Sequence, residues 1–346
     1  MAEDLNDRSR QILEAIIEDY IDSAEPVGSR TVSRRQGIGL SPASIRNVMS
    51  DLEEMGYICA PHTSAGRIPT DKGYRYYVDS LLHVRQLNEE ERQRIALHYR
   101  FKGLRVEELL QESGKVLSSI SKYAGLVLAP RFTSTVFRHI EFLKLSTGRL
   151  LVVFVSQSGL VQNKVIEGGE DLSQHDLEKI SSYLNQTLAG LTIAEVKEKI
   201  LEEMAEEKAL YDKMMKRALL LSDELLKDEM GGELFIEGTS NILDQPEFAD
   251  VERMKRLFRA FEQKSHLLNL LDKSQHAEGV QIFIGNQTEY SAIEGCSLVT
   301  ANYSNRRGTL GTLGVIGPSR MPYSVVIPIV DYTARLVSHL LENDTE

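Results

Sequence analysis

The chain has 346 residues, 42% of them hydrophobic, which is enough for two or three domains with apolar cores. Its formal net charge of -11 excludes a uniformly basic nucleic-acid binder, so any DNA contact must rest on a local cluster of cations. Two cysteines far apart in sequence argue against a disulfide framework or a zinc site, and no apolar run is long enough to span a membrane, so we expect a cytoplasmic protein that binds no membrane.

Two helices are predicted before residue 40. Leu5 to Asp22 has the apolar spacing of an amphipathic helix, and the Glu-Pro-Val-Gly sequence that follows ends it, because proline disfavours helical backbone in the residue before it. Ser29 is the predicted N-cap of a second, short helix from Arg30 to Gln36. Residues 3–25 contain eight acids, whereas residues 27–50 contain four arginines and no acid, so positive charge is concentrated after the first helix.

A third helix is predicted from Ser41 to Met55, where a hydroxyl N-cap is followed by proline at the first helical position. An apolar stripe that begins at Ile45 occupies one face and leaves small, polar and guanidinium side chains on the other, which suits a major groove. Gly56 ends the helix, and residues 57–70 predict a β-hairpin in which Gly66 is expected to permit a tight turn. This order of elements is typical of a winged helix-turn-helix and predicts a DNA-binding regulator.

The side chains expected to contact DNA come from these helices and the hairpin. Arg46 and Asn47 are the leading candidates for reading base edges, because guanidinium pairs with guanine and carboxamide with adenine, although a phosphate contact is an equal interpretation of Arg46. A solvated face is the alternative for Arg34, and a plain hairpin tip is the alternative for the hairpin loop. The tyrosines after the hairpin are interpreted as packing, which leaves Lys72 or Arg75 to contact phosphate. The candidate set is Ser29, Arg30, Arg34, Ser41, Ser44, Arg46, Asn47, His62, Thr63, Ser64, Arg67, Lys72 and Arg75.

Residues 81–124 are predicted to form a helical connector, in which Asn88 and Glu91 fit a capping pair. Three β-rich segments follow between residues 135 and 166, separated by Thr-Gly and Ser-Gly dipeptides, which is typical of a meander. A capped helix is expected at 173–188. The first 80 residues therefore form the predicted DNA-binding domain, and an α+β domain begins near residue 125.

Residues 192–250 are predicted to be a charged helical insertion. Within 195–237, 13 acids stand against 7 bases, and the leucines and methionines there exceed what one isolated helix buries. Strand patterns return near residue 280, so we expect one α+β domain, 125–191 and 251–346, interrupted by this insertion. A second copy of the chain is the expected cover for the apolar stripe, which predicts a homodimer. A helical flap packed on its own chain is the alternative.

The remaining patterns point to no catalytic or cofactor site. Glycines in 308–317 recur every third residue, which matches neither G-x-G-x-x-G nor a P-loop and favours a glycine-bearing strand. The eight histidines are scattered, with no H-E-x-x-H, and no G-x-S-x-G is present. We therefore expect no enzyme activity, no cofactor and no metal.

Five segments carry a family resemblance: PVGSR at 26–30, SPASIRN at 41–47, GYI at 56–58, HTSAGRIPTDKGYR at 62–75 and GTLGVIGPSRMPY at 311–323. They resemble the bacterial heat-inducible transcription repressor family, HrcA, and the resemblance covers essentially the whole chain. It implies a winged-helix domain, a GAF-like domain and an inserted dimerising domain, in agreement with the boundaries above.

The resemblance also implies a function. A dimer would repress chaperone operons of the groE and dnaK classes by binding double-stranded DNA at an inverted-repeat operator, CIRCE. The GroEL chaperonin would keep the repressor active until heat diverts the chaperonin to unfolded clients. A repressor that senses a small molecule through the GAF-like domain is the alternative, and ligand-induced melting shifts would distinguish it.

Overall fold

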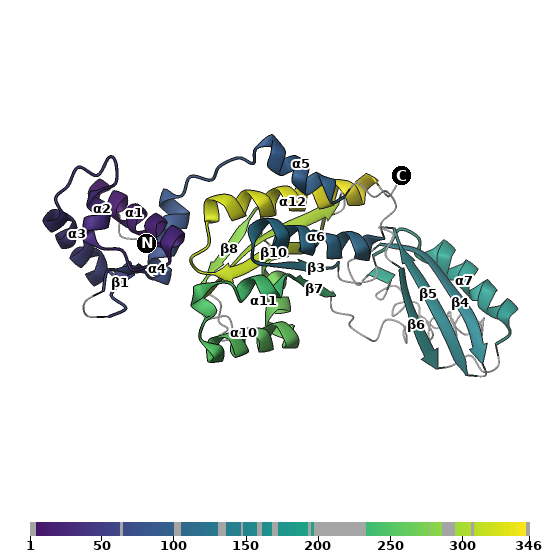
Figure 1. Cartoon of the computed structure of the whole chain (residues 1–346). Helices are drawn as coiled ribbons and strands as arrows, with labels where there is room; N and C mark the ends of the chain where they lie inside the picture. The colour runs from purple at the N-terminus through teal and green to yellow at the C-terminus, as the bar shows by residue number, and fades with distance from the viewer. Residues whose placement is uncertain are drawn as a thin grey trace.

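The protein is an α+β chain built on antiparallel sheets, as expected. Figure 1 shows an N-terminal helical unit, a central unit with a five-stranded sheet, and a third unit with a three-stranded sheet. We call these the N-terminal unit (5–81), the central unit (106–128 with 234–343) and the sheet insert (137–188). The structure, a computed structural model, describes residues 5–62, 65–99, 105–130, 136–146, 148–157, 161–167, 172–192, 195–196, 233–275, 277–285, 295–305 and 308–343.

The N-terminal unit contains the three predicted helices and the predicted hairpin. One correction concerns the second helix, because Gly28 and not Ser29 is its N-cap: Gly28 keeps an extended backbone, and Ser29 is already helical. This helix ends at Ser33, earlier than predicted, ahead of Gly37 with φ of +93°. The elements are α1 (Asp7–Ser23), α2 (Ser29–Ser33), α3 (Pro42–Glu54), β1 (Ile58–Cys59), β2 (Ile68–Pro69), α4 (Asp71–Tyr76) and the π-helical turn η1 (Tyr77–Leu81).

Gly66 serves close packing and not the tight turn that we expected. Its φ is not in the left-handed region; instead, a Cβ there would collide with the carbonyl oxygens of Pro26 and Val27. The segment before α2 and the hairpin meet at this point, where the backbones of Val27 and Arg67 exchange two hydrogen bonds of 2.9 and 2.8 Å. Glycine is needed there because two backbones lie in contact.

The central unit is a five-stranded sheet in the order β7-β3-β10-β9-β8, covered by helices on both faces. In Figure 1, α6 and α12 lie on one side of this sheet and α10 and α11 on the other. By length and composition alone α12 is apolar enough to cross a membrane, but its Val330 and Val337 are fully buried in the core that it shares with α6. The elements are α6 (Val106–Ser121), β3 (Ala124–Leu128), β7 (Leu234–Glu237), the 3-10 turns η4 (Thr239–Ile242) and η5 (Pro246–Phe248), α10 (Val251–Gln263), α11 (Ser265–Gln275), β8 (Gln281–Ile284), β9 (Cys296–Asn305), β10 (Gly308–Pro318) and α12 (Tyr323–Asn343).

The region of the predicted connector, residues 81–124, contains the two helices α5 and α6. α5 (Glu89–Leu97) begins with the expected capping box of Asn88 and Glu91. The second helix of that region, α6, instead belongs to the central unit, because Leu110 and Leu117 are fully buried against the sheet and α12.

The glycine-rich segment at 308–317 is a strand, β10, as interpreted from the sequence. Its glycines fit close neighbours on both faces: a Cβ on Gly314 would meet the Val299 carbonyl oxygen, and one on Gly317 would meet the Tyr123 ring.

The sheet insert contains β4 (Phe137–Ser146), β5 (Arg149–Ser156), β6 (Val161–Glu167) and α7 (Gln174–Leu188) around a core of its own. These strands form the predicted meander, but among the described residues they pair with no strand of the central unit, which differs from our grouping of 125–191 with 251–346. Of the described strands before residue 191, β3 alone pairs with a C-terminal strand, β10. β7, which lies inside the predicted insertion of 192–250, pairs with β3. The charged stretch 201–232 lies outside the described residues.

Candidate DNA interface

α3 presents a polar face at the surface of the N-terminal unit. Ile45, Val48 and Leu52 of the predicted stripe are buried, together with Met49. Met55, the last residue expected in that stripe, is the half-buried C-cap. The opposite face exposes Arg46 and Asn47 together with Ala43 and Ser50, which our candidate set omits. Their spacing of i, i+3, i+4 and i+7 is the signal that identifies Ala43 and Ser50 as part of the same face.

Two candidate serines build the start of α3. The Ser41 hydroxyl accepts a hydrogen bond of 3.1 Å from the Ser44 backbone N–H, and the two hydroxyls lie 3.0 Å apart. No acidic side chain occupies the first turn of this helix, so the positive end of its dipole is left for an anion. The acids of α3, such as Glu54, lie at its C-terminal end.

Arginines of the α2 region fall into two groups. Arg30 and Arg34 are exposed, and no ion pair to either is found among the described residues. Arg35, in contrast, lies 2.8 Å from Glu18 and 3.2 Å from Asp19 of α1, which ties α2 to α1. Ser29 is half-buried at the first position of α2.

Fewer side chains of the hairpin and the residues after it are available to contact DNA than the sequence indicated. His62 is exposed, whereas Thr63 and Ser64 lie outside the described residues. The Arg67 guanidinium pairs with Glu53 of α3 at 2.7 Å. The Lys72 ammonium donates to the Met55 carbonyl at 2.7 Å and also lies 4.4 Å from the centre of a tyrosine ring beneath it.

Arg75 contacts a different part of the protein. Its guanidinium lies 3.3 Å from Asp79 and donates a hydrogen bond to the carbonyl of Ile282 in β8. No sequence pattern indicated this contact or the Arg67–Glu53 pair, because the partners are 207 and 14 positions apart along the chain. The structure thus groups Arg30, Arg34, Arg46 and the neighbouring Asn47 as exposed candidates, and it places Arg67, Lys72 and Arg75 in contacts within the protein.

Known proteins match the whole chain. The family model described as HrcA protein C terminal domain matches residues 107–327. A heat-inducible transcription repressor HrcA from Geobacter sulfurreducens is 57% identical over 341 residues, which cover 99% of both chains. The protein of the same name from Syntrophobacter fumaroxidans is 45% identical over 345 residues, again 99% of both chains. A crystal structure of a hypothetical protein has a TM-score of 0.61 at 24% identity over 99% of this chain and 100% of that chain, which supports the fold alone.

Proposed function

Because this chain belongs to the HrcA family of heat-inducible transcription repressors, we propose that it represses heat-shock chaperone operons of the groE and dnaK classes. In this proposal it binds double-stranded DNA as a homodimer, at the inverted-repeat operator CIRCE, in the cytoplasm. The N-terminal unit acts as a winged helix-turn-helix, with α3 in the major groove and the hairpin as the wing.

The observation that carries the DNA-binding proposal is the exposed face of α3. Arg46 and Asn47 are adjacent, exposed and able to read guanine and adenine edges, and the first turn of the helix holds no acid. Arg30 and Arg34 lie on the preceding helix and its C-cap, where phosphate contacts position a helix-turn-helix.

We assign dimerisation to the sheet insert (137–188). The sequence analysis assigned it to residues 192–250, of which 197–232 lie outside the described residues. The face of the three-stranded sheet opposite α7 exposes Leu143 at 36% and Val165 at 44%, and both pair in register with Leu151 of the middle strand. Leu145 and Val161 are exposed by about half of their surface on the outer strands. An apolar sheet face of this kind favours a self-complementary interface about a two-fold axis. A dimer then presents two α3 helices to the two halves of a palindromic site.

The role of the GroEL chaperonin rests on the family resemblance. In the proposal, chaperonin raises the fraction of correctly folded repressor, and heat lowers that fraction by diverting chaperonin to other clients.

The test compares a duplex that carries the inverted repeat with a scrambled duplex of equal length, in a salt series and with or without chaperonin. We expect binding at least about a thousandfold tighter to the repeat and a higher active fraction with chaperonin. Arg46→Ala is expected to weaken repeat binding by about 1–3 kcal/mol, whereas Arg335→Gln, on the exposed face of α12, serves as the matched control. Equal, steeply salt-dependent binding to both duplexes would refute sequence-specific repression.

A further inference from the structure

Two arginines connect the N-terminal unit to the central unit. Each unit contributes one arginine, which donates a hydrogen bond to a backbone carbonyl of the other unit. Arg320 of the central unit donates a hydrogen bond of 2.6 Å to the carbonyl of Ile21 in α1. Arg75 of α4 donates to the carbonyl of Ile282 in β8. We call this pair of contacts the arginine clasp.

Arg320 meets a negative helix end. Ile21 lies in the last turn of α1, where carbonyls have no partner within the helix and the dipole is negative. α1 has no basic residue in its last turn, while Asp22 adds a carboxylate there. Glu247 holds Arg320 in place from the central unit, and the side chains of this ion pair are only 13% and 15% exposed. The guanidinium fork thus bridges an acid of one unit and the helix end of the other.

Arg75 meets a sheet edge. β8 is the outermost strand of the five-stranded sheet on its side, so its carbonyls are not all used by a neighbouring strand. Arg75 is 27% exposed and also pairs with Asp79, four residues later, so it is fixed from two directions. Near it, Asp71 approaches Gly285 so closely that a Cβ on this glycine would overlap the carboxylate.

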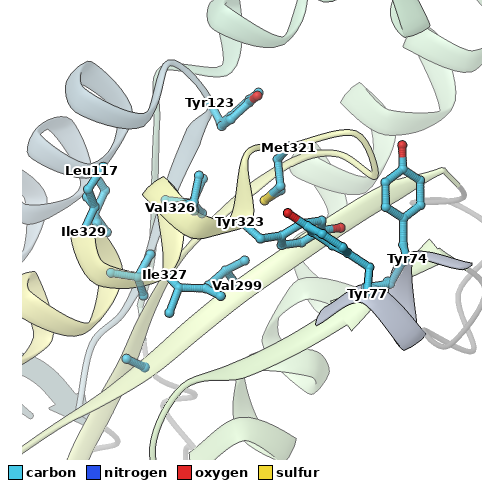
Figure 2. Packing of buried hydrophobic residues seen from close by; sticks show 14 of the residues in the cluster. Tyr74, Tyr77, Leu117, Tyr123, Val299, Met321, Tyr323, Val326, Ile327 and Ile329 are labelled. Carbon is cyan, nitrogen blue, oxygen red and sulfur yellow. The ribbon is translucent and has the colours of Figure 1, made fainter. Parts of the chain in front are cut away.

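Aromatic side chains add a second kind of contact between the N-terminal unit and the central unit. Tyr74 of α4 and Tyr323 at the start of α12 are 3% and 0% exposed, with ring centres 6.3 Å apart. The Tyr323 hydroxyl is held by Ser297 and by the Ser319 carbonyl, both in the central unit. Figure 2 shows Tyr74, Tyr77, Met321 and Tyr323 among the residues of one hydrophobic cluster, which contains side chains of both units. The N-terminal unit is therefore docked and not merely tethered.

We propose that Arg75 and Arg320 are positioning residues that fix the orientation of α3 relative to the central unit and thereby, in the dimer, the separation of the two α3 helices. This proposal rests on the proposed function and adds to it. Arg75 then acts on DNA through orientation and not through a phosphate. Fixing the two helices in advance lowers the cost of engaging both half-sites at once, and leaves the affinity for a single half-site unchanged.

The test measures binding of the full-length protein to three duplexes: the full inverted repeat, one half-site and a scrambled sequence, each in a salt series. The variants are Arg75→Gln and Arg320→Lys. Lysine at position 320 keeps the positive charge beside Glu247, but it lacks the second nitrogen with which the guanidinium also donates to the Ile21 carbonyl. Arg34→Gln is the control for a phosphate contact, and Arg335→Gln, 78% exposed in a local pair on α12, is the control for loss of an arginine.

We expect both clasp variants to bind the full repeat at least about tenfold more weakly, with half-site affinity and salt slope unchanged. Arg34→Gln should instead weaken all duplexes and reduce the slope by about 0.9. Equal losses on full repeat and half-site with a smaller slope would make Arg75 a phosphate contact and overturn the proposal. Unchanged binding to every duplex would overturn it as well.

A measurement without DNA separates this proposal from the proposed function. Spin labels at Glu54→Cys of α3 and Arg256→Cys of α10, in a Cys59→Ser background and diluted with unlabelled protein, report the distance between the units by pulsed electron resonance. We expect one narrow distance distribution that broadens in both clasp variants while circular dichroism stays unchanged. A distribution unaffected by the variants would refute the clasp. If the parent protein fails to distinguish repeat from scrambled DNA, the proposed function fails, and the distance distributions alone decide the clasp.

Discussion

Replacing Arg67 by glutamine tests whether the hairpin arginine contacts DNA or braces the hairpin against α3. In the structure its Nη2 and Nε lie 2.7 and 2.9 Å from the same carboxylate oxygen of Glu53. The hairpin is further fixed by the backbone bridge of Arg67 to Val27. We expect Arg67 to act on DNA only through Glu53, by holding the hairpin at a fixed angle to α3.

The magnitude follows from the exposure of this pair. The side chains of Arg67 and Glu53 are 27% and 33% exposed, so water screens much of their attraction. A pair of this kind contributes about 0.5–1 kcal/mol to stability. If the whole of it is used to hold the hairpin in its binding position, operator affinity should fall about two- to fivefold in Arg67→Gln and by the same factor in Glu53→Gln.

The assay is a double-mutant cycle on operator binding, with each protein titrated across a salt series. The double variant should bind no more weakly than either single variant, because both remove one interaction, and the salt slope should stay constant. The reasoning is refuted if Glu53→Gln strengthens binding and Arg67→Gln lowers the salt slope by about 0.9, since a released Arg67 would then be binding phosphate.

Three further outcomes are expected. Ser41→Ala removes the N-cap of α3 and should lower the free energy of unfolding by about 1 kcal/mol; urea unfolding checks this, and an unchanged midpoint would contradict it. The Glu91 carboxylate accepts from Arg85 and from the Asn88 N–H, which lowers its pKa from 4.5 to about 2, so it stabilises the fold above pH 4.5 and loses that contribution as the pH falls towards 2. As the pH is lowered across that range, the urea midpoint should therefore fall more steeply in the parent than in Glu91→Gln. Parallel plots of midpoint against pH would show that ionised Glu91 does not stabilise the fold. If the proposed dimer forms through the sheet insert, Leu143→Glu should convert it to a monomer in sedimentation experiments, whereas Val84→Glu, also an exposed apolar position, should leave it intact.

The helices and hairpin of the N-terminal unit were predictable because their sequence signals are local. The cap at Ser41, the apolar stripe of α3 and the turn at Gly56 each lie within one or two helical turns, and the structure has all three. Gly66 shows the limit of such signals: the sequence marks it as a special position, but only the approach of the Pro26 and Val27 carbonyls gives the reason.

Strand partners were not predictable for a related reason. β3 and β4 are both β-rich and close in sequence, yet β3 pairs with β7 and β10 while β4 pairs with β5. A strand's composition reports that it is buried on a sheet, and carries little information about which distant strand lies beside it. The same limit applies to Arg75, whose partner Ile282 is 207 positions away.

Because the chain has more acidic than basic residues, arginines that form no ion pair among the described residues are candidates for binding an anionic ligand. With 51 acids against 40 lysines and arginines, acidic partners are in excess: Arg67 and Arg320 each pair with one acid, and Arg35 pairs with two. Arg30 and Arg46 have no ion pair among the described residues, and they lie in a stretch of the sequence without acids. Keeping unpaired cations together costs repulsion, which an anionic ligand would remove. In the proposed function, the acidic remainder of the protein repels DNA in general, so we expect the affinity for the operator to come from base contacts on the α3 face.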